Sequence, residues 1–246
     1  MKPLQNPAIL IRAIPVKEYD AIYVLLTPDY GKVRLYRKGA KRQKSRFSRG
    51  LESYNLLDIS FGWSRRQSLG RFFSFHVAKG YHELVRDIHR SLVFSMVLEA
   101  VDKLSIEGDA QPKLFAFVQK LQRFMAQTRL PADCMCLYVL VKLCQFYGVT
   151  PLLAACQACG KRRAGYFSLK GGIVCGQCLA TLQAPYFVCS DTVRGMLRHM
   201  AASAMEAIDC RQVSRAVMRQ YACIMVDYLK YNFNITLRAW SVMASL

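Results

Sequence analysis

The sequence has few of the residues from which catalytic sites are usually assembled. Its 246 residues include only 16 acidic side chains and four histidines. No paired carboxylates stand out, and the histidines fit no recognisable triad or metal spacing. The patterns G-x₄-G-K-[S/T], G-x-G-x-x-G and H-E-x-x-H are also missing. The sequence therefore gives no indication of an enzyme. A catalytic site assembled from distant residues would, however, leave no local pattern.

Long hydrophobic runs are missing as well. The apolar run at residues 8–11 stops at Arg12, which makes it too short for the core of a signal peptide. The longest apolar stretch, residues 135–149, is interrupted by Lys142 and Gln145. It falls short of the roughly 20 residues that a membrane span needs. We therefore expect a cytoplasmic protein without a membrane partner, in which cysteines stay reduced.

The sequence has an excess of positive charge. Lysine and arginine together number 35, and the formal net charge is +19. A hydrophobic fraction of 53% is enough for a folded core, so wholesale disorder is excluded. A protein this basic normally has a polyanion as a partner, either a nucleic acid or an anionic membrane surface. A basic surface kept for solubility is the plainer alternative.

The charge is concentrated near the N-terminus. Residues 1–80 hold sixteen basic and five acidic side chains, and nine bases but no acid lie between Asp29 and Glu52. Basic groups neutralise phosphates, and aromatic rings offer faces for unpaired bases. A solvated face is the alternative, but no acids are interspersed to neutralise the segment. The predicted nucleic-acid-binding residues are Lys32, Arg34, Tyr36, Arg37, Lys38, Lys41, Arg42, Lys44, Arg46 and Arg49.

Residues 1–80 predict a small β-barrel. Strand-like runs occupy residues 8–16, 21–27, 32–37, 56–63 and 69–77. In the third run, alternation places Val33 and Leu35 inward and the charged side chains outward. Five short strands with a longer insertion after the third are typical of an OB-fold. An SH3-like barrel is the main alternative.

From residue 81 the apolar spacing changes to the period of a helix. The pattern predicts an α-helical domain over residues 81–246, with helices near 92–104, 114–125 and 133–147. Ser190 can cap a helix that runs to about residue 201. Asp209 is expected to cap a long helix over residues 210–231.

Four of the ten cysteines have the spacing of a metal site. Cys156, Cys159, Cys175 and Cys178 form C-x₂-C-x₁₅-C-x₂-C, which predicts a zinc ribbon inserted at residues 154–180. Four thiolates close the tetrahedron, so we expect one structural Zn²⁺ per chain and no catalytic metal. Two disulfides or unrelated thiols are the alternatives.

Three bases follow the first cysteine pair, namely Lys161, Arg162 and Arg163. They either offset the negative charge of a zinc–thiolate centre or contact nucleic acid. Buried free thiols are expected for most of the remaining cysteines, which are Cys134, Cys136, Cys144, Cys189, Cys210 and Cys223.

The order of these features resembles the RecO family of bacterial recombination mediators. Motifs that match are Tyr19-Asp20, Lys38-Gly39-Ala40 and the four residues 148–151, followed by the cysteine pairs with the run 171–175. The resemblance covers most of the chain. It differs at residues 51–54, which read Leu-Glu-Ser-Tyr where Leu-Gln-Pro-aromatic is more usual.

The resemblance implies a function and partners. RecO-like proteins bind single- and double-stranded DNA and anneal complementary strands. They act with RecR and with the acidic C-terminal tail of single-strand-binding protein, and they help to load RecA during gap repair. No covalent chemistry and no cofactor beyond zinc are implied, and a place beside the bacterial nucleoid is expected. An RNA-binding module and a metal-dependent nucleic-acid enzyme are the competing hypotheses.

Overall fold

The computed structural model describes residues 3–42, 45, 47, 51–63, 68–162 and 165–246. The predicted residues Lys44, Arg46 and Arg49, and also Arg163, lie outside this described part. The chain divides into two compact units, the barrel unit Met1–Thr128 and the ribbon unit Arg129–Leu246. No helix among the described residues has both the length and the apolar character needed to cross a membrane.

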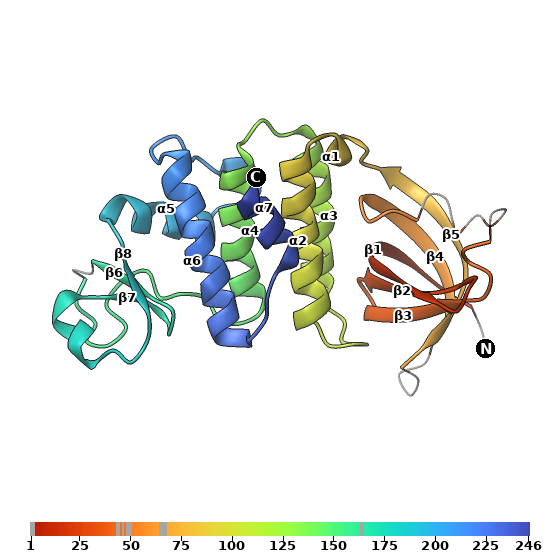
Figure 1. Cartoon of the computed structure of the whole chain (residues 1–246), viewed down its shortest axis with the longest axis horizontal. Coiled ribbons are helices and arrows are strands. Elements are labelled where there is room, and N and C mark those ends of the chain that lie inside the picture. Colours follow the sequence, from red (N-terminus) through yellow and green to blue (C-terminus); the bar gives the residue numbers. More distant parts are fainter. Residues whose placement is uncertain (1–2, 43–44, 46, 48–50, 64–67, 163–164) are drawn as a thin grey trace. The chain divides into compact units, whose positions relative to one another are not determined.

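The barrel unit begins with five strands that form a closed barrel (Figure 1). They are β1 (Leu4–Val16), β2 (Asp20–Thr27), β3 (Gly31–Arg37), β4 (Asn55–Gly62) and β5 (Gly70–Gly80). The order around the barrel is β1-β2-β3-β5-β4, and β1 also pairs with β4. Neighbouring strands are antiparallel except β3 and β5, which are parallel at Leu35 and Gly70. The predicted OB-like barrel is confirmed.

Alternate side chains fill the barrel interior, as the pleat of each strand requires. Val33 and Leu35 point inward, and Tyr23 and Leu25 come from the neighbouring strand. Phe47, which follows β3, also enters this core, and its ring centroid lies 4.9 Å from that of Phe72. An aromatic residue of the basic segment therefore serves the core and is not free to stack on a base.

The outer face of β1 and β2 is apolar as well. Ile9, Val24 and Leu26 are at most 1% exposed although they alternate with residues of the barrel core. The helices α2 (Ile88–Leu104) and α3 (Pro112–Gln127) contact these strands and follow the short helix α1 (Glu83–Arg86). The barrel ends at residue 80, where the domain boundary was expected. The compact unit extends further, to Thr128, and so includes the first three helices.

The ribbon unit is mainly helical. Its helices are α4 (Ala132–Phe146), α5 (Asp191–Ala202), α6 (Arg215–Phe233) and α7 (Arg238–Ser245), with 3₁₀ turns η2 (Gly176–Thr181) and η3 (Met205–Ala207). The helix α4 is buried on all sides over residues 134–141. Ser190 caps α5 by accepting the N–H of Val193 at 3.3 Å, as predicted.

The predicted start of the long helix at Asp209 is wrong. The helix α6 begins at Arg215, and Ser214 caps it by accepting the N–H of Val217 at 3.4 Å. The carboxylate of Asp209 instead accepts the backbone N–H and the guanidinium of Arg211, each at 3.0 Å or less. Both residues are good caps, so only the contacts made after folding decide between them.

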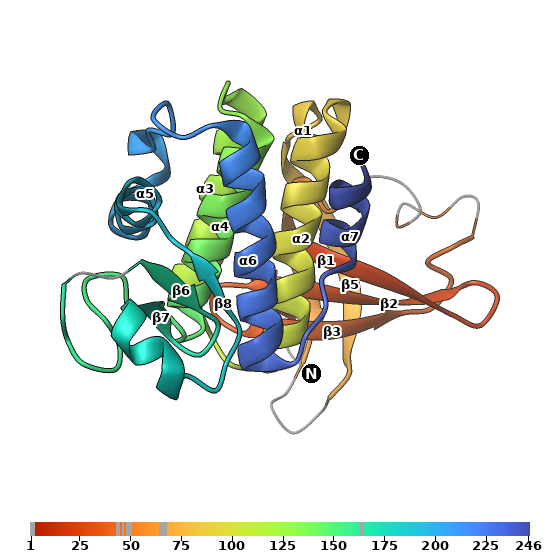
Figure 2. The same cartoon turned by 60° about the vertical axis from the view of Figure 1, so that its left-hand side comes forward.

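The ribbon unit contains a three-stranded sheet in the order β7-β6-β8, whose last strand lies beyond the predicted insertion at residues 154–180. Its strands are β6 (Tyr166–Ser168), β7 (Gly172–Val174) and β8 (Tyr186–Val188), of which the last was not predicted. The sheet lies beside α6 (Figure 2), where the rings of Phe167 and Tyr228 have centroids 5.6 Å apart. Asn232 of α6 donates to the carbonyl of Leu169 at 3.1 Å, so the sheet is fixed to the helices.

Candidate nucleic-acid interface and metal centre

The most basic described part of the barrel is the turn after β3, residues 38–42, which we call the basic turn. Its conformation depends on Asp20, which is 8% exposed and begins β2. One carboxylate oxygen accepts the N–H of Gly39 at 2.8 Å, and the other accepts the hydroxyl of Tyr36. Both donors lower the pKa of Asp20, and the Tyr36 hydroxyl has the larger effect, followed by the Gly39 N–H. An ionised acid thus holds the basic turn in place.

Tyr19 gives the basic turn a second support. The N–H of Lys41 donates to the Tyr19 carbonyl at 2.9 Å, and the guanidinium carbon of Arg42 lies 5.8 Å from the Tyr19 ring centroid. Gly39 has a φ of +66°, a left-handed conformation that glycine adopts without strain. The side chains of Lys38, Lys41 and Arg42 are exposed. These three predicted residues therefore come together on one ordered turn.

Arg37 is only half-exposed and is engaged within the barrel. Its guanidinium donates to the carbonyls of Phe72 and Phe73 at 3.2 and 3.0 Å. The guanidinium carbon also lies 4.6 Å from the centroid of the Phe47 ring. Its first role is therefore to join β3 to β5 and to cover Phe47.

Two predicted binding residues on β3 have acidic partners, one in the last turn of the helix α2 and one just after that helix. Lys32 is 8% exposed, and its ammonium donates to the carbonyl of Asp102 and lies 3.8 Å from the carboxylate of that residue. Burial lowers the pKa of Lys32. Arg34 forms a 3.7 Å ion pair with Glu107, and both side chains are 38% exposed. Lys32 therefore points away from the barrel core but not into solvent.

The structure adds two exposed bases to this end of the barrel. Arg71, at the start of β5, pairs in register with Tyr36. Lys17 lies in the turn between β1 and β2, and its charge, like that of Lys38, helps to lower the pKa of Asp20. In OB-folds the loops that bind nucleic acid are those between strands 1 and 2 and between strands 4 and 5. Arg71 could have been found only by pairing the third predicted strand with the fifth, because that pairing places it beside Tyr36.

The four predicted metal ligands form one cluster. Their sulfur atoms all lie within 4.8 Å of one another, and the Sγ atoms of Cys159 and Cys175 are 3.7 Å apart. Four sulfurs bound to Zn²⁺ at about 2.3 Å in a tetrahedron are separated by about 3.8 Å. The donor set and its spacing therefore fit a tetrahedral metal ion with four thiolate ligands.

Tight turns bring the two cysteine pairs together. The N–H of Gly160 donates to the carbonyl of Cys156 at 2.9 Å, and that of Cys178 donates to the carbonyl of Cys175 at 3.0 Å. The N–H of Cys175 also donates to the Sγ of Cys156 at 3.4 Å. Burial opposes ionisation of Cys156, but backbone donors, of which Cys175 is the foremost, outweigh it and lower its pKa to about 6. A thiolate is the form that binds a metal ion.

The other six cysteines are free thiols outside the cluster. Cys134, Cys136, Cys144, Cys189 and Cys210 are buried, as expected for most of them, and Cys223 on α6 is exposed. Burial raises the pKa of Cys144 to about 12 and shifts that of Cys136 in the same direction. These buried thiols stay protonated and fill the core as small apolar groups.

These features define a class of protein, in which an OB-like barrel precedes a helical part that carries a four-cysteine ribbon. The family model described as Recombination protein O N terminal matches residues 1–81. The model described as Recombination protein O C terminal matches residues 85–241. The chain therefore belongs to the RecO family of DNA repair proteins.

Similar proteins extend along nearly the whole chain. A protein named DNA repair protein RecO from Exiguobacterium sibiricum is 27% identical over 244 residues, which cover 97% of this chain and 95% of the relative. One of the same name from Caldanaerobacter subterraneus is 22% identical over 241 residues, which cover 97% and 96% of the two chains. A third, from Desulfitobacterium hafniense, is 24% identical over 242 residues and covers 96% and 87%. The resemblance inferred from the sequence is confirmed.

Proposed function

We propose that this protein binds single- and double-stranded DNA, anneals complementary strands, and acts with RecR to load RecA on DNA coated by single-strand-binding protein. It works in the bacterial cytoplasm beside the nucleoid. It performs no covalent chemistry, since binding and alignment of the strands are sufficient for annealing. Family membership supports the DNA repair role, and the basic turn supports the mode of binding.

The observation that carries the proposal is the fixed position of the basic turn. Asp20 and Tyr19 hold the backbone of residues 38–42, while Lys38, Lys41 and Arg42 stay exposed. Cations on a rigid turn bind phosphates with little loss of conformational freedom. Contacts to the phosphate backbone leave the base edges available for pairing with a second strand.

The four-cysteine cluster has a structural role in this proposal. Cys156, Cys159, Cys175 and Cys178 would hold one Zn²⁺, which would join the two turns of the ribbon. Four thiolates leave no position for water, so the ion would supply stability and no hydrolytic chemistry. The acidic tail of single-strand-binding protein and RecR are the protein partners that we propose.

The test is strand annealing with DNA that single-strand-binding protein already covers. We expect the protein to accelerate duplex formation between complementary oligonucleotides, and we expect added RecR to promote RecA assembly. A protein that leaves the annealing rate unchanged would contradict the proposal. Competition with RNA of equal length tests the RNA-binding alternative, since preferential displacement by RNA would favour it. Strand cleavage in Mg²⁺ or Mn²⁺ would instead establish a nuclease.

A further inference from the structure

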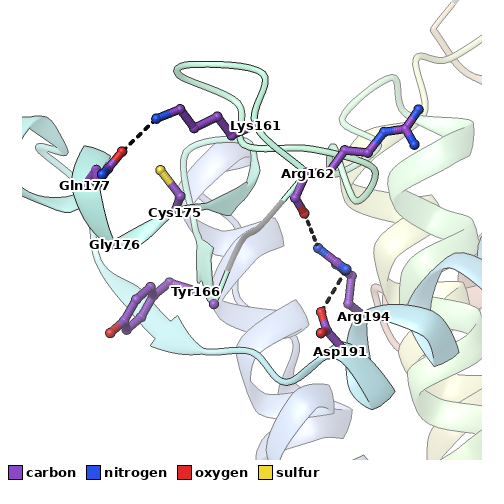
Figure 3. Close-up of a pocket in the computed structure, with 9 residues that line it drawn as sticks. Lys161, Arg162, Tyr166, Cys175, Gly176, Gln177, Asp191 and Arg194 are labelled. Atoms are coloured by element: carbon purple, nitrogen blue, oxygen red, sulfur yellow. Dashed lines mark hydrogen bonds and ion pairs between the residues drawn. The ribbon is translucent and has the colours of Figure 1, made fainter.

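The ribbon unit contains a cavity of about 820 Å³ beside the second cysteine pair (Figure 3). We call it the ribbon groove. The loop after Cys159, the start of β6, the turn that holds Cys175 and the first turn of α5 surround it. Every residue that lines it belongs to the ribbon unit, so the groove shares no residue with the basic turn of the barrel.

The groove has an excess of positive charge. Its basic lining residues are Lys161, Arg162 and Arg194, and its acid is Asp191. Asp191 and Arg194 form an ion pair of 2.7 Å, and Arg194 also donates to the carbonyl of Arg162 at 2.9 Å. Arg194 therefore joins two walls of the groove and neutralises its acid. The charges of Lys161 and Arg162 have no acid among the lining residues to offset them.

In the described part of the ribbon, neither of these two cations forms a hydrogen bond with a sulfur of the cluster. The ammonium of Lys161 donates to the side-chain carbonyl of Gln177 at 2.8 Å, and both residues are exposed. The side chain of Arg162 extends away from Cys175 (Figure 3). Of the two roles expected for these bases, the geometry of Arg162 favours contact with an external anion, whereas Lys161 lies beside the second cysteine pair and its exposed charge is available for either role.

The groove also has an aromatic side. Tyr166 begins β6 and is half-exposed, and its ring meets that of Tyr186 edge-on at 88° with centroids 5.7 Å apart. Tyr186 is 49% exposed. The backbone beside Tyr166 is open, since a Cβ added to Gly165 would meet no atom within 4 Å. Cations beside an exposed, edge-supported ring are the pattern of a surface for single-stranded nucleic acid.

We propose that the ribbon groove is a second binding site for single-stranded nucleic acid. The phosphate backbone lies against Lys161 and Arg162, and a base stacks on Tyr166. An acidic peptide would use the two cations but has no need of the tyrosine pair, so a single strand accounts for more of the groove. This inference deepens the proposed function and rests on it, because it assigns part of the DNA contact to the ribbon.

The test compares three variants of the full chain by fluorescence anisotropy with a labelled oligo(dT). The groove variant is Lys161→Glu/Arg162→Glu. The matched control is Lys170→Glu/Lys230→Glu, which changes the same charge at two exposed residues of the ribbon unit that do not line the groove. The barrel variant is Lys38→Ala/Lys41→Ala/Arg42→Ala. Thermal melting and bound metal are measured for each, so that loss of folding is recognised.

We expect the groove variant to bind oligo(dT) about tenfold more weakly than wild type, with a shallower dependence on salt. The control should stay within about twofold of wild type. Equal losses in the groove variant and the control would overturn the inference, and so would unchanged binding by the groove variant. If wild type itself fails to bind, the proposed function fails. If only the barrel variant loses affinity, the function stands and the second site does not.

A local measurement tests the aromatic contact. We expect an oligonucleotide with 5-iodouracil to cross-link on irradiation to the peptide that contains Tyr166. Tyr166→Leu keeps an apolar side chain but removes the ring, and it should reduce that cross-link and weaken binding about fivefold, whereas Tyr166→Phe should not weaken binding. A cross-link confined to other peptides would overturn the stacking contact. A labelled oligo-aspartate peptide that only the groove variant fails to bind, while its DNA affinity is unchanged, would assign the groove to an acidic peptide instead.

Discussion

The carboxylate of Asp20 accepts the backbone N–H of Gly39 at 2.8 Å, across nineteen residues of sequence. Its second oxygen accepts the hydroxyl of Tyr36. These bonds tie the start of β2 to the end of β3 and to the basic turn. An acidic residue therefore lies within the surface that we propose for DNA. Its charge repels phosphate, so it favours binding only by holding the basic turn in position.

Replacing this acid tests that role. Asp20→Asn keeps the size of the side chain but leaves one carbonyl oxygen to accept two donors. We expect DNA binding to weaken about fivefold, although the substitution removes a negative charge that repels phosphate. The measurement is fluorescence anisotropy with a labelled single-stranded oligonucleotide.

Glu18→Gln is the matched control, because it removes the same charge from an exposed residue two positions away. Its affinity should be unchanged or slightly higher, since a repulsive charge is lost while the amide oxygen of glutamine can still accept from the Tyr19 hydroxyl, as Glu18 does. If Asp20→Asn also bound more tightly, the positioning role of Asp20 would be contradicted.

The same carboxylate predicts a pH dependence of stability. The Tyr36 hydroxyl, followed by the Gly39 N–H, lowers the pKa of Asp20 in the folded protein. Its contribution is therefore complete above the ordinary carboxyl pKa of about 3.9, and it is lost as the pH falls through the lowered folded value. The melting temperatures of wild type and Asp20→Asn should differ by a constant amount from about pH 5 to 8 and converge below about pH 4. A difference that grows at acid pH would contradict this assignment.

The exposed bases of the basic turn should control the salt dependence of binding. Lys38→Ala/Lys41→Ala/Arg42→Ala removes up to three phosphate contacts, so the slope of log affinity against log salt should fall by about 2. Affinity at low salt should drop at least about tenfold. The control is Lys113→Ala/Lys120→Ala/Arg123→Ala, which removes the same charge from exposed residues of α3. Equal slopes for both triple variants would place the binding surface elsewhere.

Replacing Lys32 tests whether this buried base contributes to stability or to DNA binding. Its ammonium donates to the Asp102 carbonyl, and its side chain is 9% exposed. Lys32→Ala should lower the free energy of unfolding by about 1–3 kcal/mol, since a buried acceptor loses its donor and the packed stem is removed. The oligonucleotide affinity of the folded variant should stay within about twofold of wild type. Urea denaturation measures the free energy of unfolding, and anisotropy measures the affinity. A large loss of affinity with unchanged stability would show that Lys32 contacts DNA.

The metal centre is tested by removing one ligand. Cys156→Ser should reduce bound zinc from about one equivalent per chain to nearly none and lower the melting temperature, because metal binding contributes to folding. Cys223→Ser is the control, since Cys223 is an exposed thiol outside the cluster. Elemental analysis and thermal melting check both variants. A wild-type protein without zinc, or equal melting of both variants, would contradict a structural zinc site.

The sequence alone predicted features that depend on local pattern. The cysteine spacing identified all four clustered sulfurs, since a C-x₂-C turn brings its own two thiols together. The alternation of Val33 and Leu35 with charged residues gave the correct inward face of β3. The five strand-like runs, with a longer insertion after the third, also predicted the OB-like barrel.

The start of one helix was predicted wrongly because two nearby residues can both act as its N-cap. Asp209 and Ser214 are both good caps, and the helix begins after the second because the first binds Arg211. The strand β8 gave little signal, since it has only three residues and is paired by a single neighbour. Such elements depend on partners that the local sequence does not reveal.

The net charge of +19 was readable from the sequence, but which of its cations remain exposed was not. Lys32 meets Asp102 across seventy residues, and Arg34 meets Glu107, because α2 and the segment after it pack on this side of the barrel. Lys38, Lys41 and Arg42 stay exposed on a turn that Asp20 and Tyr19 hold. The sequence by itself determined that the protein is basic and barrel-forming, and that it has four cysteines at the spacing of a metal site. Only the tertiary structure decided which charges are neutralised internally, since that depends on residues brought together by folding.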